Sequence, residues 1–262
     1  MALYRVREGM GMPVTVHVVD ASAEESWLDA VYADFVALDE VFSPFRPDST
    51  VSRINRGEVE EANAGSLVRQ AIDLCRLYQQ ATRGYFTAWI RGTFDPSGLV
   101  KGWAIDRGAT ILAEKGCRNF YLDAGGDVQA RGRNEEGLPW RVGIRHPVER
   151  DKVARVVLAE DLAVATSGSY EKGDHIVNPY ADRPAADLLS FTVVGPDILS
   201  ADVYATAAFA MGDAGLESMN WVAGCEGVAI IRSLQVSCVA DVARYCVAAG
   251  SLPPRPASCC PF

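Results

Sequence analysis

Residues 200–212, SADVYATAAFAMG, contain the pair of side chains with the clearest chemical use. If this segment is a helix, Asp202 and Thr206 are four residues apart and their oxygens lie on one face, about one turn apart. A carboxylate and a hydroxyl at that spacing can bind a hard cation such as Mg²⁺, which takes its other ligands from water, carbonyl and phosphate oxygens. The alternative is structural: Asp202 caps the helix and Thr206 bonds back to a main-chain carbonyl.

A second candidate is residues 94–106, FDPSGLVKGWAID. Small residues such as Ser97 and Gly98 let the main chain approach a ligand, and Lys101, just inside a helix start, is placed to face a phosphate. The alternative is a loop with a solvated lysine. In GGDVQARG, the glycines Gly125 and Gly126 indicate a turn with positive φ or a close approach to a ligand.

The three histidines differ in their surroundings. His17 belongs to an alternating strand pattern and His146 precedes a proline at a strand end, so both are interpreted as structural. His175 lies in the polar segment SGSYEKGDHIVNP, where an imidazole can contact a ligand or move a proton. The sequence contains no Ser/His/Asp order, zinc-ligand spacing or Walker loop.

Composition limits the classes of function. The chain has 262 residues with 25 Lys and Arg against 34 Asp and Glu, a net charge of −9, which argues against a nucleic-acid partner. An anionic ligand must then be neutralised locally by a metal ion, main-chain N–H groups or a helix N-terminus. We expect no membrane span and no targeting segment. Seven cysteines, an odd number without metal-ligand spacing, favour reduced thiols and a cytoplasmic location.

The periodicities predict an α+β fold of strands, hairpins and helices without strict βαβ alternation. Expected helices cover residues 22–41, 65–82, 103–116, 199–211 and 215–224, and residues 42–58 are expected to be irregular. Expected strands cover residues 12–21, 119–124, 140–147, 153–159, 162–170, 188–196 and 227–233. We expect one domain over residues 1–250 and a Pro/Cys-containing tail over 251–262, in which Cys259 and Cys260 are the thiols most open to oxidation.

The order of the blocks along the chain carries a resemblance. Eight sequence blocks, spread over residues 9–232, resemble the ApbE family of FAD:protein FMN transferases in their order. These blocks are MGMPVTV, FSPFRPDSTVSRIN, GYFTA, FDPSGLVKGWAID, YLDAGGDVQARG, ATSGSY, DHIVNP and SADVYATAAFAMG. The resemblance implies a single domain of mixed and antiparallel sheets with flanking helices and a flavin cleft. It also implies a Mg²⁺-dependent reaction that splits FAD at its pyrophosphate, joins FMN by a phosphoester to a Thr or Ser of an acceptor protein, and releases AMP.

The same resemblance implies roles for individual residues. The metal ligands would be Asp202, Thr206 and the Val100 carbonyl, and His175 and Asp202 would be catalytic, with His175 or a carboxylate near the metal as the base. The FAD-binding residues it implies are Met10, Phe45, Tyr85, Phe86, Thr87, Ser97, Lys101, Asp106, Gly125, Gly126, His175 and Ile176. For the pyrophosphate we expect the cation and main-chain groups near Gly125, Gly126 and the helix after Ser97 to matter more than Lys101, whose charge in a hydrated setting is worth about 1 kcal/mol.

Four positions depart from the family pattern and keep two alternatives open. Met12 replaces a Thr, Phe45 stands where a flavin-stacking Tyr is frequent, Thr87 replaces an Asp, and Asn178 stands in a loop that often reads His-x-x-Asp-Pro. Phe45 should still stack, because stacking needs the ring and not the hydroxyl. The alternatives are an FAD pyrophosphatase that yields FMN and AMP, and a non-catalytic FAD-binding protein. Family members are typically exported lipoproteins, whereas this chain shows no export signal, so its acceptor should be cytoplasmic or face the cytoplasm.

Overall fold

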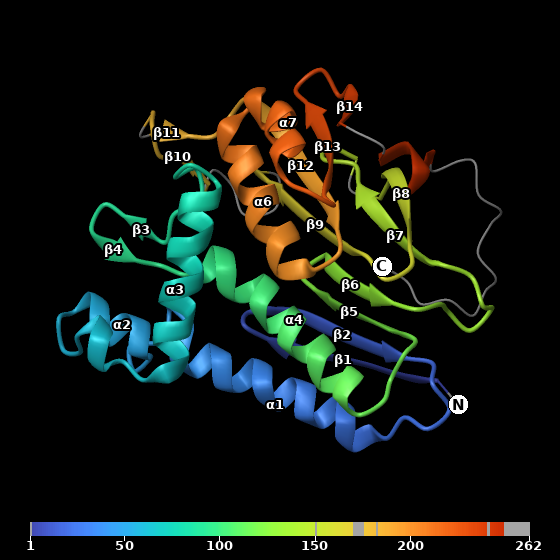
Figure 1. The fold of residues 1–262 in the computed structure, drawn as a ribbon, viewed down its shortest axis with the longest axis horizontal. Coiled ribbons are helices and arrows are strands. Elements are labelled where there is room, and N and C mark those ends of the chain that lie inside the picture. Colours follow the sequence, from blue (N-terminus) through green and yellow to red (C-terminus); the bar gives the residue numbers. More distant parts are fainter. Residues whose placement is uncertain (1, 150, 170–175, 182, 240–241, 249–262) are drawn as a thin grey trace.

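The computed structural model describes residues 2–149, 151–169, 176–181, 183–239 and 242–248. Its centre is an eight-stranded antiparallel sheet in the order β1-β2-β5-β6-β9-β12-β13-β14. Helices α1, α4 and α6 pack on one face of this sheet, and a three-stranded sheet, β15-β8-β7, packs at the β6–β13 part of the other face (Figure 1). The predicted α+β class is confirmed.

The elements have the following bounds. The large sheet contains β1 (Leu3–Gly9), β2 (Met12–Val18), β5 (Phe120–Ala124), β6 (Asp127–Arg131), β9 (Ala163–Gly168), β12 (Leu188–Gly195), β13 (Glu226–Ile231) and β14 (Val236–Val239). The small sheet contains β7 (Trp140–Arg145), β8 (Val153–Ala159) and β15 (Cys246–Ala248). The α-helices are α1 (Glu25–Phe42), α2 (Thr50–Asn55), α3 (Ser66–Ala81), α4 (Ser97–Glu114), α6 (Ile198–Met211) and α7 (Ala214–Ser218). Two hairpins are β3 (Trp89–Ile90) with β4 (Thr93–Phe94), and β10 (Val177–Asn178) with β11 (Arg183–Pro184).

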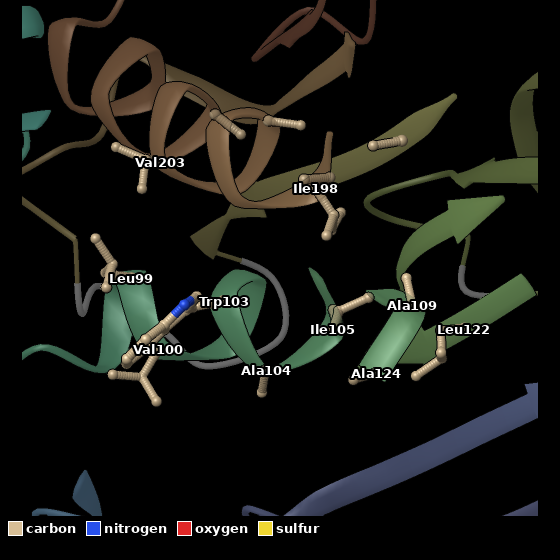
Figure 2. Close-up of a cluster of buried hydrophobic side chains, with 14 of the residues drawn as sticks. Leu99, Val100, Trp103, Ala104, Ile105, Ala109, Leu122, Ala124, Ile198 and Val203 are labelled. Atoms are coloured by element: carbon tan, nitrogen blue, oxygen red, sulfur yellow. The ribbon is translucent and has the colours of Figure 1, made fainter. Parts of the chain in front are cut away.

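Helices α4 and α6 cross at the centre of the core. Figure 2 shows apolar side chains of both helices facing the space between them, among them Leu99 of α4 and Ile198 and Val203 of α6. Helix α6 is buried on nearly all sides because it is rich in alanine and lies between α4 and strands β9 and β12. Any polar side chain placed on this helix is therefore held in a rigid, mostly apolar setting.

Strand β2 contributes one face to the hydrophobic core and the other face to the cleft. Val14, Val16 and Val18 are fully buried against the helices, whereas the alternate residues Thr15 and His17 point to the opposite face. The small sheet covers only the β6–β13 part of that opposite face. The open remainder, over β1, β2 and β5, forms the floor of a large cleft.

The sequence patterns do not predict several elements: strand β6, the short hairpins β3–β4 and β10–β11, and β1, α2, β14 and β15. β1 carries Arg5, Arg7 and Glu8 because it is an edge strand, where charged side chains are common. α2 lies within the stretch predicted to be irregular; it has six residues, too few for a helical period, and begins where the Ser49 hydroxyl accepts the Ser52 N–H. β14 and β15 are only four and three residues long. Helix α4 begins at Ser97, six residues before its predicted start at 103.

No helix in the described ranges has the length and hydropathy that a membrane crossing requires. The predicted tail over 251–262, with Cys259 and Cys260, lies outside the described residues.

Candidate active site

A cleft of about 1920 Å³ opens between the uncovered floor of the large sheet, strand β7 and the facing parts of α4 and α6. Pockets for drug-sized molecules are typically about 300–1,000 Å³, so this cleft has room for a dinucleotide. Most of the predicted ligand residues line it: Met10, Phe45, Tyr85, Phe86, Thr87, Ser97, Val100, Lys101, Gly125, Gly126, Ile176, Asp202 and Thr206. Segments from seven separate parts of the chain therefore meet at one site.

Asp202 lies in the second turn of α6 and is only 2% exposed. Its Oδ2 accepts a hydrogen bond from the Gly102 N–H of α4 at 3.0 Å. The capping alternative is wrong, because the N-cap of α6 is Asp197, whose carboxylate accepts the Ser200 N–H at 2.8 Å. Asp202 is thus not needed to begin its helix, and its burial at the cleft wall calls for another explanation.

The residues around Asp202 offer oxygen atoms. Thr206 is one turn further along α6, with its hydroxyl 3.1 Å from the hydroxyl of Ser167 on β9. Val100 lies on the facing helix α4 and also borders the cleft. A carboxylate, a hydroxyl and a carbonyl are hard donors of the kind that Mg²⁺ prefers. The described residues contain no cluster of three or more His, Cys, Asp or Glu side chains suited to a metal, so the donor set fits a cation that shares its coordination with water and phosphate.

Lys101 is not the hydrated side chain that the sequence suggests. It is 21% exposed, and its Nζ forms ion pairs with Asp127 Oδ2 and, at 3.2 Å, with Asp202 Oδ1. Burial alone lowers the pKa of Lys101, but attraction to both carboxylates outweighs it and the pKa is raised, so the ammonium is retained. Its charge acts in a buried setting, where the surface figure of about 1 kcal/mol does not apply.

Asp127 is the site residue that the sequence analysis missed. It begins β6, is 1% exposed, and its Oδ1 accepts the Thr166 N–H of β9 at 2.8 Å. Burial raises the pKa of Asp202, and the negative charge of Asp127 raises it further against the opposing effect of Lys101. The available signal was an aspartate at a strand start directly after two turn glycines, in the quoted block GGDVQARG.

The two turn glycines behave only partly as predicted. Gly125 and Gly126 do adopt positive φ, 62° and 93°. Their N–H groups are already used, however, because Gly125 donates to Pro13 O at 3.2 Å and Gly126 donates to Asp123 Oδ1 at 2.9 Å. These two N–H groups are therefore not free, and the role of main-chain groups near Gly125 and Gly126 in binding the pyrophosphate stays a prediction.

Aromatic side chains line another part of the cleft. Phe45 is 92% exposed on the loop after α1, and Tyr85 lies with its ring centroid 4.9 Å from that of Tyr180. The Tyr180 hydroxyl donates to Arg83 O, which ties the β10 region to the end of α3. Thr87 uses its hydroxyl to accept the Trp89 N–H at 3.2 Å, while Phe86 is 3% exposed and contributes mainly to the core.

Two predicted residues are not brought into the cleft by the described structure. Asp106 lies further along α4, away from the cleft wall, where burial and the charge of Asp197 raise its pKa. His175 lies outside the described residues, although its neighbour Ile176 is on the cleft wall.

Known proteins share both the sequence pattern and the fold. The model of the ApbE family matches residues 10–93 and 90–230. Curated relatives include FAD:protein FMN transferases of Vibrio cholerae, 33% identical over 129 residues (45% of this chain, 39% of the relative), and of Escherichia coli, 32% identical over 146 residues (52% of this chain, 41% of the relative). The matched segment thus spans about two fifths of the length of these relatives.

Solved structures share the arrangement of helices and sheets. The flavin transferase ApbE from Vibrio cholerae superposes with a TM-score of 0.82 at 20% identity, covering 94% of this chain and 99% of that one. The ApbE protein of Thermotoga maritima gives a TM-score of 0.80 at 21% identity, with 94% and 99% covered. Together with the family match over most of the sequence, this agreement leads to one conclusion: the chain belongs to the ApbE family.

Proposed function

We propose that this protein transfers FMN from FAD to a Thr or Ser hydroxyl of an acceptor protein and releases AMP. The observation that carries the proposal is that oxygen donors of Asp202, Thr206 and Val100 lie on the wall of a cleft of about 1920 Å³, which the exposed ring of Phe45 also borders. The relatives' description as FAD:protein FMN transferases supports the same activity.

The reaction needs one phosphoanhydride bond of FAD to break and one phosphoester bond to form. Asp202, Thr206 and the Val100 carbonyl would hold Mg²⁺, which when bound neutralises the pyrophosphate and stabilises charge on the transferred phosphoryl group. Phe45 and Tyr85 offer ring faces for the flavin, and stacking fixes the orientation of the ligand. Lys101 adds a positive charge to the same wall. His175 remains the proposed base for the acceptor hydroxyl.

We also propose a cytoplasmic location with an acceptor that is cytoplasmic or faces the cytoplasm. All five cysteines within the described ranges are free, and Cys75, Cys117 and Cys225 among them are buried. Free thiols are typical of a reducing compartment.

Incubation of the purified protein with FAD, MgCl₂ and candidate acceptor proteins tests the proposal. Flavin fluorescence that stays with an acceptor on a denaturing gel, together with AMP by liquid chromatography, supports transfer. Free FMN and AMP without labelled acceptor would support the pyrophosphatase instead. FAD that remains unchanged with every acceptor would support a flavin-binding protein. Parallel reactions in EDTA and with Asp202→Ala show whether any turnover depends on the proposed cation site.

A further inference from the structure

Three charged side chains from three elements meet at the α4–α6 junction: Lys101 of α4, Asp127 of β6 and Asp202 of α6. Each carboxylate gives one oxygen to the main chain, since Asp127 Oδ1 accepts the Thr166 N–H and Asp202 Oδ2 accepts the Gly102 N–H. The remaining oxygens, Asp127 Oδ2 and Asp202 Oδ1, both face the ammonium of Lys101. All four carboxylate oxygens therefore have partners within the protein.

Lys101 supplies the positive charge that the two carboxylates require. Both aspartate side chains are about 2% exposed, and two buried negative charges without a counter-charge would be strongly destabilising. The Gly102 N–H binds the other oxygen of Asp202, so Asp202 Oδ1 is paired with Lys101. A divalent cation that binds Asp202 must therefore compete with the ammonium of Lys101 for this carboxylate.

We propose that Lys101 is the resident counter-cation of this site and that it sets the affinity for the divalent cation by competing for Asp202, while Asp127 retains the ammonium when the cation binds. The inference rests on the proposed function, because it takes Asp202 as a ligand of Mg²⁺. The role of Asp127 is to position Lys101. Removal of the competing charge should tighten binding of the divalent cation, and removal of the Asp127 anchor should weaken it.

The arrangement also couples the cation to FAD. Two positive groups close together repel each other, so Lys101 makes Mg²⁺ binding weaker in the absence of an anion. The pyrophosphate of FAD carries two negative charges that offset this repulsion. Binding of FAD and binding of Mg²⁺ should therefore favour each other by the same factor.

The test is a calorimetric titration of MgCl₂ into the purified protein without FAD, at one pH and ionic strength. We expect Lys101→Met to tighten Mg²⁺ binding at least tenfold and Asp127→Asn to weaken it at least threefold, because Lys101 then pairs with Asp202 alone. The matched control is Arg107→Met. Arg107 is on the same helix and pairs with Asp34 at 2.9 Å, but neither residue lines the cleft, so its loss should change Mg²⁺ affinity less than twofold.

The double variant Lys101→Met/Asp127→Asn separates competition from simple attraction. It removes one positive and one negative charge, so the local net charge stays the same. If Lys101→Met alone does not fold, the double variant replaces it in the test. Tighter Mg²⁺ binding than wild type supports the inference. Binding equal to or weaker than wild type overturns it and leaves the proposed metal site intact. If wild type and variants bind no Mg²⁺ and FMN transfer proceeds in EDTA, both this inference and the metal part of the proposed function are wrong.

Discussion

Two parts of the cleft differ in how far their side chains are buried and bound to partners within the protein. At the α4–α6 junction, both carboxylates are almost fully buried and every carboxylate oxygen has a partner. In the aromatic part of the cleft, Phe45 is 92% exposed. The core thus holds in place the groups proposed for phosphoryl chemistry, whereas the aromatic part leaves ring surface free for a ligand.

Close packing explains why the junction is rigid. A Cβ added at Gly102 would lie 2.9 Å from Asp202 Cβ and 3.0 Å from Ile198 O, so only glycine lets α4 approach α6 this closely. That approach brings the Gly102 N–H to Asp202. The aromatic part of the cleft has no comparable constraint at Phe45.

Asp202→Ala, which removes a carboxylate at the α4–α6 junction, should have the largest effect. We expect FMN transfer to fall about a thousandfold, or about 4 kcal/mol in transition-state energy, because the cation loses the charged side chain among its proposed ligands. Circular dichroism should show an intact fold, since Asp197 and not Asp202 caps α6.

The matched control on the same helix is Asp197→Ala. Loss of the cap should lower stability by about 1 kcal/mol while transfer stays near the wild-type rate. Wild-type turnover by folded Asp202→Ala would remove Asp202 from the mechanism.

Gly102→Ala tests the rigidity of the junction. We expect a loss of about 1–3 kcal/mol in the free energy of unfolding, measured by urea denaturation, because the new methyl group must push the helices apart. Gly98→Ala on the same helix is the control, since its added Cβ meets only Phe86 at 3.4 Å and alanine favours the helix. Equal stability of the two variants would mean that the close approach at Gly102 is not a constraint.

Phe45→Ala tests the aromatic part of the cleft. Loss of the ring should weaken FAD binding about two- to tenfold, or ~0.5–1.5 kcal/mol, with no change in the unfolding temperature. Phe45→Tyr keeps the ring and should bind FAD within twofold of wild type. A lower unfolding temperature for Phe45→Ala with unchanged FAD affinity would instead give the ring a packing role.

His17 on the cleft floor gives the smallest expected effect. Its ring packs against Tyr4, Tyr121 and Trp140 and its Nε2 lies 2.7 Å from Glu135. Burial lowers the pKa of His17 below 6.5, although Glu135 opposes the shift. The folded state therefore binds this proton less readily than the unfolded state, and the stability from neutral His17 is present above pH 6.5 and is lost as pH falls through the lowered pKa.

Urea unfolding of wild type and His17→Gln between pH 7.5 and 5 measures this contribution. The free energy of unfolding should fall more steeply with decreasing pH in wild type than in the variant. Equal slopes would show that His17 does not contribute to the pH dependence of stability.

Local patterns predicted much of the fold and part of the site. The apolar spacing of residues 22–41 and 199–211 corresponds to α1 and α6, and the four-residue spacing of Asp202 and Thr206 places both on the cleft wall. These features depend on neighbours in the chain, which periodicity captures.

Local sequence patterns do not predict which charged side chains surround one another in the site. Lys101 is ion-paired and only 21% exposed because the fold brings Asp127, 26 residues later, and Asp202, about 100 residues later, next to it from a strand and a helix. The engaged N–H groups of Gly125 and Gly126 likewise depend on Pro13, in a neighbouring strand, and on the local turn at Asp123. Long-range pairing decides the ion pairs of Lys101 and the partner of the Gly125 N–H, and no spacing in the sequence records it.

We propose that a cation held by Asp202 gives this acidic protein its affinity for the pyrophosphate of FAD. Titration of FAD into wild type and Asp202→Ala, each with MgCl₂ and with EDTA, tests it most directly. We expect chelation to weaken FAD binding to wild type at least tenfold, ~1.4 kcal/mol, and to leave FAD binding to Asp202→Ala unchanged. The same FAD affinity of wild type in MgCl₂ and in EDTA would contradict it.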